Sequence, residues 1–259
     1  MSNYEERFCG IKRLYGSKAL TTFKNSHICL VGIGGVGSWV AESLARSGIG
    51  QLTLIDMDDI SYTNTNRQVH TLTDNIGKMK AEVMAERCRQ INPDIKVNAI
   101  TDFVNKQNCF TYLSSDFDYI FDAIDSIDAK VALIAHCKRN KYPLLTSGGA
   151  GGQIDPTQVQ VADLARTIQD PLAAKVRSEL RRSYNFTKNP KRKFRINCVF
   201  STEQLRYPDL DGEVCREKTK SDKSIPVDST RSFGAASMVT ASFAFVGVAF
   251  ILKKLLKKD

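Results

Sequence analysis

Four glycines gather in one short stretch of the chain, and their spacing is typical of a phosphate-binding turn. Residues 32–37 read GIGGVG, with glycines at Gly32, Gly34, Gly35 and Gly37. The stretch follows an apolar run typical of a strand and precedes a segment with helical spacing. Glycine lets the backbone approach a phosphate closely, and the amino end of a helix supplies amide donors and a positive dipole. We therefore expect a nucleotide at this turn.

Further charged residues follow the turn and narrow the choice of nucleotide. Asp56 ends the next predicted strand, 19 residues after Gly37, where it would accept hydrogen bonds from ribose hydroxyls of NAD or ATP alike. Arg67 and Lys80 add the positive charge that a triphosphate needs. Asp125 follows a later strand, in a position suited to Mg²⁺ between phosphates. The set favours magnesium-bound ATP and makes Arg67, Lys80 and Asp125 the candidate catalytic residues.

Strands and helices alternate through the first half of the chain. Apolar runs predict strands at 28–34, 52–56, 96–100, 119–124 and 143–147, and helical spacing predicts helices at 38–47, 78–91 and 128–140. This order indicates an α/β fold, a Rossmann-like, doubly wound and mainly parallel sheet whose ligand crevice lies beyond the carboxyl ends of the strands. We expect a single domain over 1–259, with a nucleotide-binding core at 1–152 and a substrate-binding extension at 153–259.

The extension carries most of the chain's excess positive charge. We predict a helix at 171–184, a loop at 185–194, a strand at 195–201 and a polar, mobile loop at 202–231. The net charge is +9, and residues 175–195 hold nine basic side chains against a single acid, Glu179. Such an excess favours a polyanionic partner, either nucleic acid or an anionic membrane face. The alternative is a surface that serves solubility.

An uncharged stretch near the carboxyl end is long enough to span a bilayer. The 21 residues between Arg231 and Lys253 carry no formal charge. Serine, threonine and glycine dilute its apolar character, so we predict a helix over 232–252 that is buried in the fold or in a dimer interface. Membrane contact, aided by the lysines that follow, is the alternative.

The cysteines and the amino terminus favour a reducing compartment. There are seven cysteines, an odd number, with no CxxC pair, which argues against a disulfide framework and against a four-cysteine zinc site. The amino-terminal segment MSNYEERFCG carries charges and no apolar run, unlike a secretory signal. We expect a cytoplasmic protein.

The segments GIGGVGS, LIDMDDI, NTNRQ, GKMK and DAIDS together resemble the ubiquitin-activating-type adenylating family. The resemblance implies that a carboxylate is adenylated with MgATP and that pyrophosphate is released. It also implies roles for single residues. Asp56 would hold the ribose, the phosphates would be bound by Asn64, Arg67 and Lys80, and Asp125 would hold the metal, with Asp58, Gln68 and Ser126 beside them. Arg13, in the segment RLYG, would reach the phosphates of a partner subunit in a homodimer.

Longer segments, among them VGIGGVGSWVAESLARSGIG and TSGGAGGQIDPTQVQVADLARTIQDPLAAKVR, resemble one branch, the bacterial tRNA threonylcarbamoyladenosine dehydratases. The resemblance implies ATP-dependent cyclisation of N6-threonylcarbamoyladenosine, next to the anticodon, to its oxazolone form. It implies tRNA bound by 175–195, with Tyr184, Phe186 and Phe194 stacking on unpaired bases unless they are core residues. It also links the chain to a cysteine desulfurase with its sulfur-acceptor partner, and a monovalent cation is a further candidate cofactor.

A catalytic cysteine is a point on which the sequence departs from that branch. Ser229 stands where members of the branch can have a cysteine just before the SFG segment. This weakens an obligatory covalent role at that position. Cys198 and Cys215 remain candidates, although Cys198 lies in an apolar strand and is better explained as a structural residue.

Three other functions fit parts of the sequence. An adenylating enzyme that activates the carboxyl terminus of a sulfur-carrier protein shares the nucleotide motifs, but the basic 175–195 segment and the unpaired cysteines disfavour it. A NAD-dependent oxidoreductase fits the glycine turn alone, and Arg67 and Lys80 disfavour it. A non-enzymatic tRNA- or partner-binding module would not need the cations together with Asp125.

Overall fold

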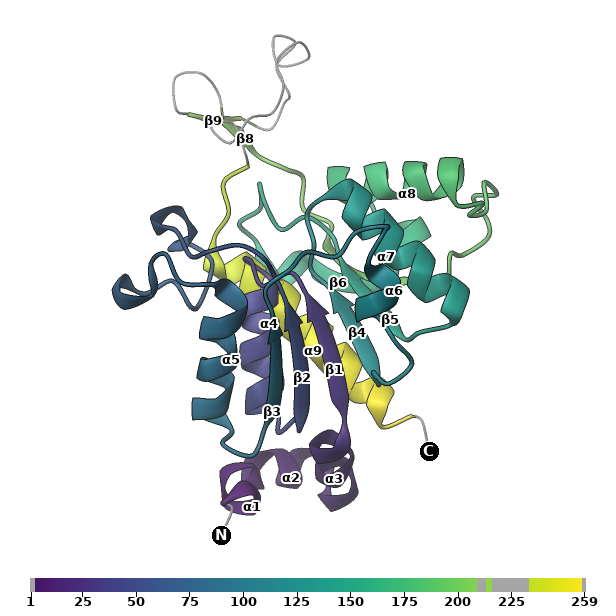
Figure 1. Ribbon diagram of the computed structural model, residues 1–259. Helices are drawn as coiled ribbons and strands as arrows, with labels where there is room; N and C mark the ends of the chain where they lie inside the picture. Colours follow the sequence, from purple (N-terminus) through teal and green to yellow (C-terminus); the bar gives the residue numbers. More distant parts are fainter. Residues whose placement is uncertain (1–2, 209–212, 216–232, 258–259) are drawn as a thin grey trace.

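The computed structural model describes residues 3–208, 213–215 and 233–257, and its centre is one seven-stranded sheet in the order β3-β2-β1-β4-β5-β7-β6 (Figure 1). All neighbouring strands in this sheet run parallel except β6, which is antiparallel to β7. A separate ribbon pairs β8 with β9. The strands are β1 His27–Val31, β2 Gln51–Ile55, β3 Lys96–Ile100, β4 Tyr119–Asp122, β5 Leu144–Ser147, β6 Val159–Asp163, β7 Asn197–Ser201, β8 Tyr207–Pro208 and β9 Val214–Cys215.

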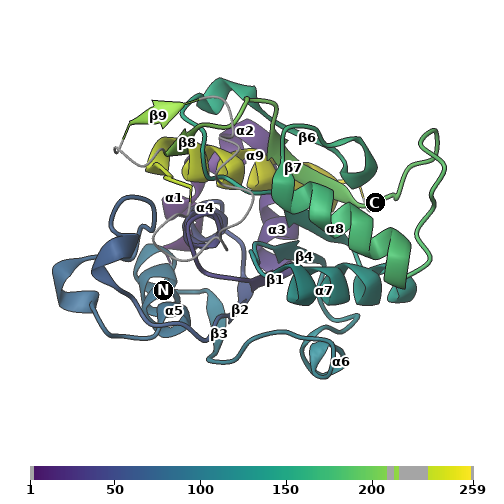
Figure 2. The ribbon, with the colours of Figure 1, turned by 90° about the horizontal axis from the view of Figure 1, so that it is seen from above.

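Helices cover both faces of the sheet, so the predicted α/β, doubly wound architecture is confirmed (Figure 2). Alternate residues of β1 show the two layers. Ile28 and Leu30 join the core under α4, α5 and α9, whereas Cys29 and Val31 join the core under α7 and α8. The helices are α1 Tyr4–Arg7, α2 Cys9–Tyr15, α3 Ser17–Asn25, α4 Gly37–Arg46, α5 Lys80–Ile91, α6 Cys109–Tyr112, α7 Ile127–Asn140, α8 Pro171–Ser183 and α9 Ser237–Leu255, with short 3-10 turns η1 Tyr62–Asn64, η2 Thr73–Asn75, η3 Pro156–Gln158 and η4 Leu164–Arg166.

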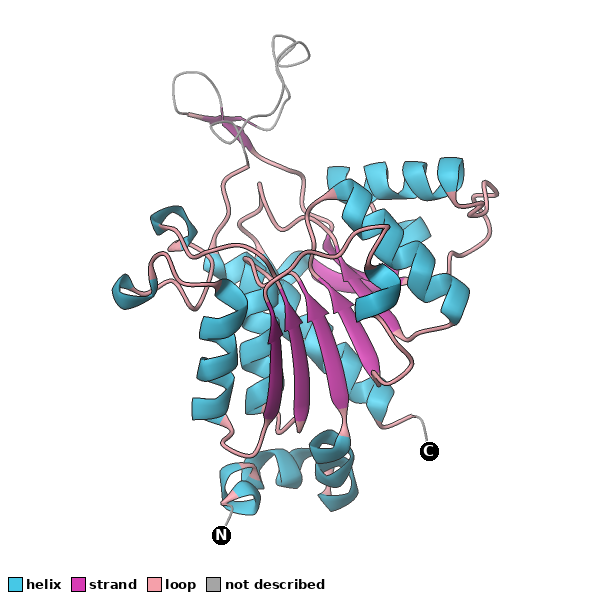
Figure 3. Cartoon of the chain, in the orientation of Figure 1, coloured by secondary structure: helices cyan, strands magenta, loops and turns pink. Residues whose placement is uncertain are grey.

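The parallel strands all end at one edge of the sheet, where the connecting loops gather (Figure 3). The opposite, amino edge is closed by α1, α2 and α3, which the sequence pattern had not indicated. α3 leads directly into β1, and the Tyr4 hydroxyl donates a hydrogen bond to the carbonyl of Gly48, at the end of α4. The three amino-terminal helices therefore cover the amino edge of the sheet, and the carboxyl edge is left free for a functional site.

The second half of the chain joins the same sheet as the first. β6 and β7 extend it beyond β5, and β6 is a strand that sequence reasoning missed. The expected loop at 202–231 is only partly described. Within it, Tyr207–Pro208 pairs with Val214–Cys215, which corrects the prediction at those positions, and most of the remainder lies outside the described residues.

Most of the uncharged carboxyl-terminal segment forms α9, which packs on the sheet as one of its covering helices. α9 begins five residues later than the predicted helix at 232–252 and extends into the lysines that follow, to Leu255. One helix, Ser237–Leu255, is long and apolar enough to cross a membrane by length and composition, with a mean hydropathy of 1.7. Its inward side is buried in the main core, including Val239, Phe243 and Val248. Gly247 allows the closest approach, because a Cβ there would lie 2.6 Å from the ring of Phe121 in β4. A core helix of a soluble domain has the same composition.

We expect Gly247→Val to lower the free energy of unfolding by about 1–3 kcal/mol, because the added carbons would overlap Phe121. Ala249→Val is the control, since Ala249 lies on the exposed side of α9. Valine lowers helix propensity relative to alanine but raises it slightly relative to glycine, so a larger loss in Gly247→Val cannot come from propensity. Urea unfolding of both variants would measure the difference. Equal effects would contradict the packing of α9 on the sheet.

Candidate functional site

The glycine turn leaves β1 with a backbone that side chains would not permit. Gly32 has a φ of 88°, and a Cβ there would lie 2.9 Å from the carbonyl group of Ala123, at the end of β4. A Cβ at Gly37 would overlap the carbonyl oxygen of Gly32 at 1.8 Å. Gly34 is less crowded, since the nearest atom to an added Cβ is the Gln68 amide nitrogen at an ordinary contact distance of 3.8 Å. The turn therefore exposes backbone at the start of α4, as phosphate binding requires.

Two side chains form hydrogen bonds with the backbone of Ile33 in this turn. The Ile33 amide donates to Asp56 Oδ2 at 2.5 Å, and His70 Nε2 donates to the Ile33 carbonyl at 2.9 Å. The other Asp56 oxygen accepts from the Asp58 amide at 2.8 Å. Burial raises the pKa of the Asp56 carboxyl above its ordinary value. Asp56 thus fixes the turn, and its remaining lone pairs leave it able to accept hydrogen bonds from a ribose.

His70 is a residue of the site that sequence reasoning missed. Its side chain is fully buried, and burial lowers the pKa of the imidazole to about 4. A carbonyl can only accept, so Nε2 carries the proton and Nδ1 is the unprotonated nitrogen. Among the described residues Nδ1 has no hydrogen-bond partner. The neutral ring serves as a fixed donor to the glycine turn, a role that a lone histidine in the sequence does not indicate.

The predicted phosphate cations are both present beside the turn, and each already has partners. Lys80 forms an ion pair with Asp58, with Nζ 2.7 Å from Oδ2, and its side chain is only 7% exposed. The Arg67 guanidinium donates to the Thr63 carbonyl at 2.9 Å and to the Asn66 side chain at 3.0 Å. Their arrangement presents positive charge next to the glycine turn in a fixed position.

The amides of Asn64 and Gln68 complete this side of the site. The Asn64 side-chain oxygen accepts from the Ser61 amide at 3.0 Å, which closes the capping box of η1. Gln68 is 6% exposed, and its Oε1 has no hydrogen-bond partner among the described residues. The Gln68 side chain is thus held against the glycine turn, with its amide nitrogen 3.8 Å from the position of a Cβ on Gly34.

Asp125 and Ser126 lie in the turn that joins β4 to α7. Both are exposed, and Ser126 is the residue before the first turn of α7. Within the part of the chain that the structure describes, the Asp125 carboxylate makes no hydrogen bond or ion pair. An unpaired carboxylate at the carboxyl edge fits a divalent cation bound between phosphates.

A buried network fixes the backbone of this turn. The Lys130 ammonium lies 2.9 Å from Asp122 Oδ2 and donates to the Ile124 carbonyl at 2.8 Å. The other Asp122 oxygen accepts from the Ile124 amide at 3.0 Å, and Thr146 Oγ1 donates to Asp122 at 2.6 Å. Asp122, at 0% exposure, was not among the predicted site residues. Its burial shows that it supports the turn, whereas Asp125 faces the solvent.

Arg13 lies apart from the other predicted residues. It is exposed on α2, at the amino edge of the sheet, whereas the glycine turn lies at the carboxyl edge (Figure 1). Within one chain it therefore does not join the site. This placement is compatible with the prediction that it serves a partner subunit.

The basic segment forms the second half of α8 and the loop that follows. Two exposed cations lie on α8, Lys175 and Arg182. Five more are exposed in the loop, namely Lys188, Lys191, Arg192, Lys193 and Arg195. The aromatic residues instead pack inward. Phe194 is 3% exposed, its ring lies 5.0 Å from that of Phe186, and Tyr184 packs against the same core. Phe194 is therefore unavailable for base stacking, as expected for a core residue, whereas the exposed cations remain accessible to a polyanion.

The candidate cysteines differ in their surroundings. Cys198 is fully buried in β7, and burial raises the pKa of its thiol well above the ordinary value, which suits a structural residue. Cys215 is partly exposed in β9. Ser229 lies outside the described residues, so its position in relation to the site remains a sequence-based prediction.

We expect stability to fall as the pH drops from about 6.5 toward 4, in part because of His70. The unfolded chain takes up a proton at the ordinary pKa, whereas the buried ring resists protonation until its lowered pKa is reached. The contribution is fully present above pH 6.5 and amounts to at most about 3 kcal/mol. Urea unfolding at several pH values should show a smaller acid loss in His70→Gln. An identical pH dependence in both proteins would contradict this role.

Comparisons with known proteins agree with this geometry. A tRNA threonylcarbamoyladenosine dehydratase of Escherichia coli (strain K12) is 58% identical over 255 residues, covering 98% of this chain and 95% of that protein. Another of Haemophilus influenzae (strain ATCC 51907 / DSM 11121 / KW20 / Rd) is 55% identical over 258 residues, covering 100% and 96%. The crystal structure of E. coli tRNA N6-threonylcarbamoyladenosine dehydratase in complex with ATP has a TM-score of 0.86 at 56% identity, covering 98% of this chain and 95% of that one.

The sequence model of the ThiF family matches residues 9–259. The match spans nearly all of 1–152 and all of 153–259, and strands from both parts belong to one sheet. On the match and the fold together, the chain belongs to the ThiF family.

Proposed function

We propose that this protein is an ATP-dependent tRNA-modifying enzyme that cyclises N6-threonylcarbamoyladenosine, next to the anticodon, to its oxazolone form. The observation that carries the substrate is the 58% identity, along 98% of the chain, to a tRNA threonylcarbamoyladenosine dehydratase. The geometry supports ATP as the second substrate. The glycine turn, Asp56 and the Asp125 turn all lie at the carboxyl edge of the sheet, where doubly wound folds bind nucleotides.

The reaction has two steps. An oxygen of the threonyl carboxylate attacks the α-phosphorus of ATP, and pyrophosphate leaves. The carbamoyl oxygen then attacks the activated carbonyl carbon, AMP leaves with the original carboxylate oxygen, and the carbamoyl nitrogen loses a proton. The substrate has then lost one water. Ring closure is intramolecular, so the protein mainly has to orient the two substrates and stabilise phosphate charge.

Each part of the site has a role in this scheme. The turn at Gly32–Gly37 would receive phosphate on its amides, and Asp56 would accept hydrogen bonds from the ribose. Arg67 and Lys80, with Asn64 and Gln68 beside them, would bind the phosphates. Asp125 would hold Mg²⁺, whose bound charge stabilises the departing pyrophosphate. The Asp125 carboxylate, which is exposed and makes no hydrogen bond or ion pair with the described residues, supports this assignment.

The proposed partners follow from surface charge and from the position of Arg13. The exposed cations of 175–195 would bind the tRNA backbone. The chain would form a homodimer in which Arg13 of one subunit reaches the phosphates of the other. A cysteine desulfurase with its sulfur-acceptor partner is proposed on the family resemblance alone. The burial of α9 in the core favours the cytoplasm over a membrane.

Incubation with tRNA and MgATP, followed by mass analysis of the nucleosides, tests the function directly. We expect N6-threonylcarbamoyladenosine to lose one water while AMP and pyrophosphate form. Asp125→Asn should slow product formation by about 100-fold or more, whereas Asp128→Asn, an exposed carboxylate in α7, should leave it unchanged. ATP turnover that required a sulfur-carrier protein instead of tRNA would refute the proposal.

Mixing two inactive variants tests the shared site. If Arg13 acts across the dimer, Arg13→Ala and Asp125→Asn subunits should together recover about a quarter of wild-type activity, because random pairing gives half mixed dimers with one intact site each. The control mixes Arg13→Ala with the double variant, which offers no intact site. Arg13→Ala that is fully active alone, or no recovery on mixing, would place Arg13 outside this role.

A further inference from the structure

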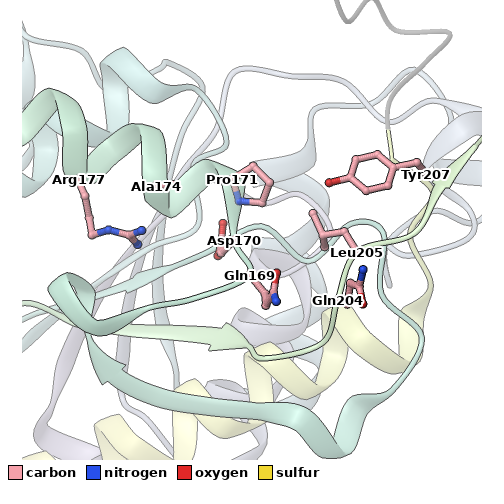
Figure 4. Close-up of a pocket in the computed structure, with 8 residues that line it drawn as sticks. All are labelled: Gln169, Asp170, Pro171, Ala174, Arg177, Gln204, Leu205 and Tyr207. Atoms are coloured by element: carbon pink, nitrogen blue, oxygen red, sulfur yellow. The ribbon is translucent and has the colours of Figure 1, made fainter. Parts of the chain in front are cut away.

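A cavity lies where α8 begins, beside the segment that follows β7. Its volume is about 300 Å³ (Figure 4). We call it the α8 pocket, and it is lined by Gln169, Asp170, Pro171, Ala174, Arg177, Gln204, Leu205 and Tyr207. Apart from Arg177, which belongs to the basic segment 175–195, none of these residues was given a role in the sequence analysis. The volume suits one small group, such as a nucleobase.

Asp170 fixes the wall of the α8 pocket that adjoins the end of β5. This buried carboxylate accepts from the Ala173 amide at 2.9 Å, which caps α8, and from the Gly149 amide at 3.1 Å. A Cβ at Gly148 would lie 1.8 Å from Asp170 Oδ2. The glycines after β5 therefore let the backbone pass directly beside Asp170, and they place no side chain between the pocket and the end of β5.

The lining combines amide, aromatic and cationic groups. Figure 4 shows the Arg177 guanidinium and the Tyr207 ring directed from opposite sides toward the region of Asp170 and Pro171. Arg177 is half-buried and donates to the hydroxyl of Thr167. Gln169 has a φ of 52°, a conformation that non-glycine residues adopt mainly where the surroundings require it. Amide groups beside an aromatic ring and an arginine are the groups that bind an unstacked base of RNA.

The position of the pocket relative to Asp125 fits the length of the substrate. Asp122 at the end of β4 aligns with Thr146 in β5, and Thr146 aligns with Cys198 in β7. Two strand spacings separate the end of β4 from that of β7, a distance of about 10 Å. The threonylcarbamoyl group resembles two residues of extended chain and spans about 7 Å. If the adenine lay in the pocket, the carboxylate of its threonylcarbamoyl group could therefore extend toward the Asp125 turn.

The pocket is also joined to the basic segment through one helix. α8 begins at Pro171 in the pocket wall and ends at Ser183, where the exposed cations of the following loop begin. Its 13 residues span about 20 Å. A tRNA backbone bound to the cations would thus lie a few nucleotides from the pocket entrance.

We propose that the α8 pocket receives the modified adenine, turned out of the anticodon loop, so that its threonyl carboxylate reaches the Asp125 turn. This inference rests on the proposed function and assigns the pocket as the part of the site that reads the substrate base. Turning out a base costs a few kcal/mol, and a fitted pocket offsets this for the correct nucleoside. Insertion of the base would place its threonylcarbamoyl group within the site, so the preference for modified over unmodified tRNA would depend on the pocket, and phosphate contacts alone cannot supply that preference.

The test compares the Kd for modified tRNA with that for an unmodified transcript of the same sequence. Ala174→Trp fills the pocket from the exposed surface of α8, and Ser178→Trp is the matched control one turn further on, outside the lining. We expect Ala174→Trp to reduce the preference for modified tRNA by about tenfold or more. Its affinities for ATP and for the unmodified transcript should stay within about twofold of wild type. Joint charge reversal of Arg192 and Lys193 to glutamate should weaken both tRNAs equally.

The possible results distinguish a failure of the pocket assignment from a failure of the proposed dehydratase function. A preference that survives Ala174→Trp, or that is lost equally in Ser178→Trp, would overturn the pocket assignment while wild-type dehydration continued. A wild type that shows no preference at all would overturn it as well. Failure of the wild type to dehydrate modified tRNA would instead overturn the proposed function.

Discussion

The ion pair between Lys130 and Asp122, buried at the carboxyl end of β4, is the interaction on which the geometry of the site depends. Lys130 is 2% exposed and Asp122 is 0% exposed, and each of these two buried charges has the other as its ion-pair partner. The pair binds both the amide and the carbonyl of Ile124 and, through Thr146, the neighbouring strand β5. Removing one partner of such a pair typically costs about 3–5 kcal/mol, because the other charge is left buried.

That pair lies between the two halves of the proposed site. On one side, its turn presents Asp125 and abuts Gly32, whose missing side chain allows contact with Ala123. On the other side, β5 continues into the glycines that pass Asp170 and border the α8 pocket. A single buried network thus sets the spacing between the place where ATP would be held and the place where the base would be held. Adenylation requires such fixed spacing because its rate depends on orientation.

The carboxyl-terminal helix contributes to the site as well as to the core. The Arg67 carbonyl accepts from the Trp39 ring at 3.0 Å and from Thr240 in α9 at 3.4 Å, and the Asn66 side chain donates to the Ala235 carbonyl at 2.7 Å. The loop that carries a proposed phosphate ligand is therefore anchored by a segment some 170 residues away in the chain. The packing of α9 on the sheet therefore also holds the Arg67 loop in place.

The sequence by itself determined the architecture and the candidate nucleotide residues. Alternating strand and helix patterns depend on local periodicity, so β3 was placed at its observed bounds and β1, β2, β4, β5 and β7 to within a few residues. Glycine at 32 and 37 likewise reflects a local steric requirement that the motif encodes directly. Helices α1–α3 and strand β6 were missed because they are short and take their stability from distant contacts, as Tyr4 does at Gly48.

Only the tertiary structure decided which of the charged residues are buried in ion pairs and which face the solvent. Asp122 and Asp125 are three residues apart and indistinguishable by type, but one is buried on Lys130 and the other faces solvent. His70 and the α8 pocket depend on residues brought together from separate segments, and Phe194 turned inward for the same reason. Burial and side-chain direction are properties of the packed chain, and no local pattern of residue types specifies them.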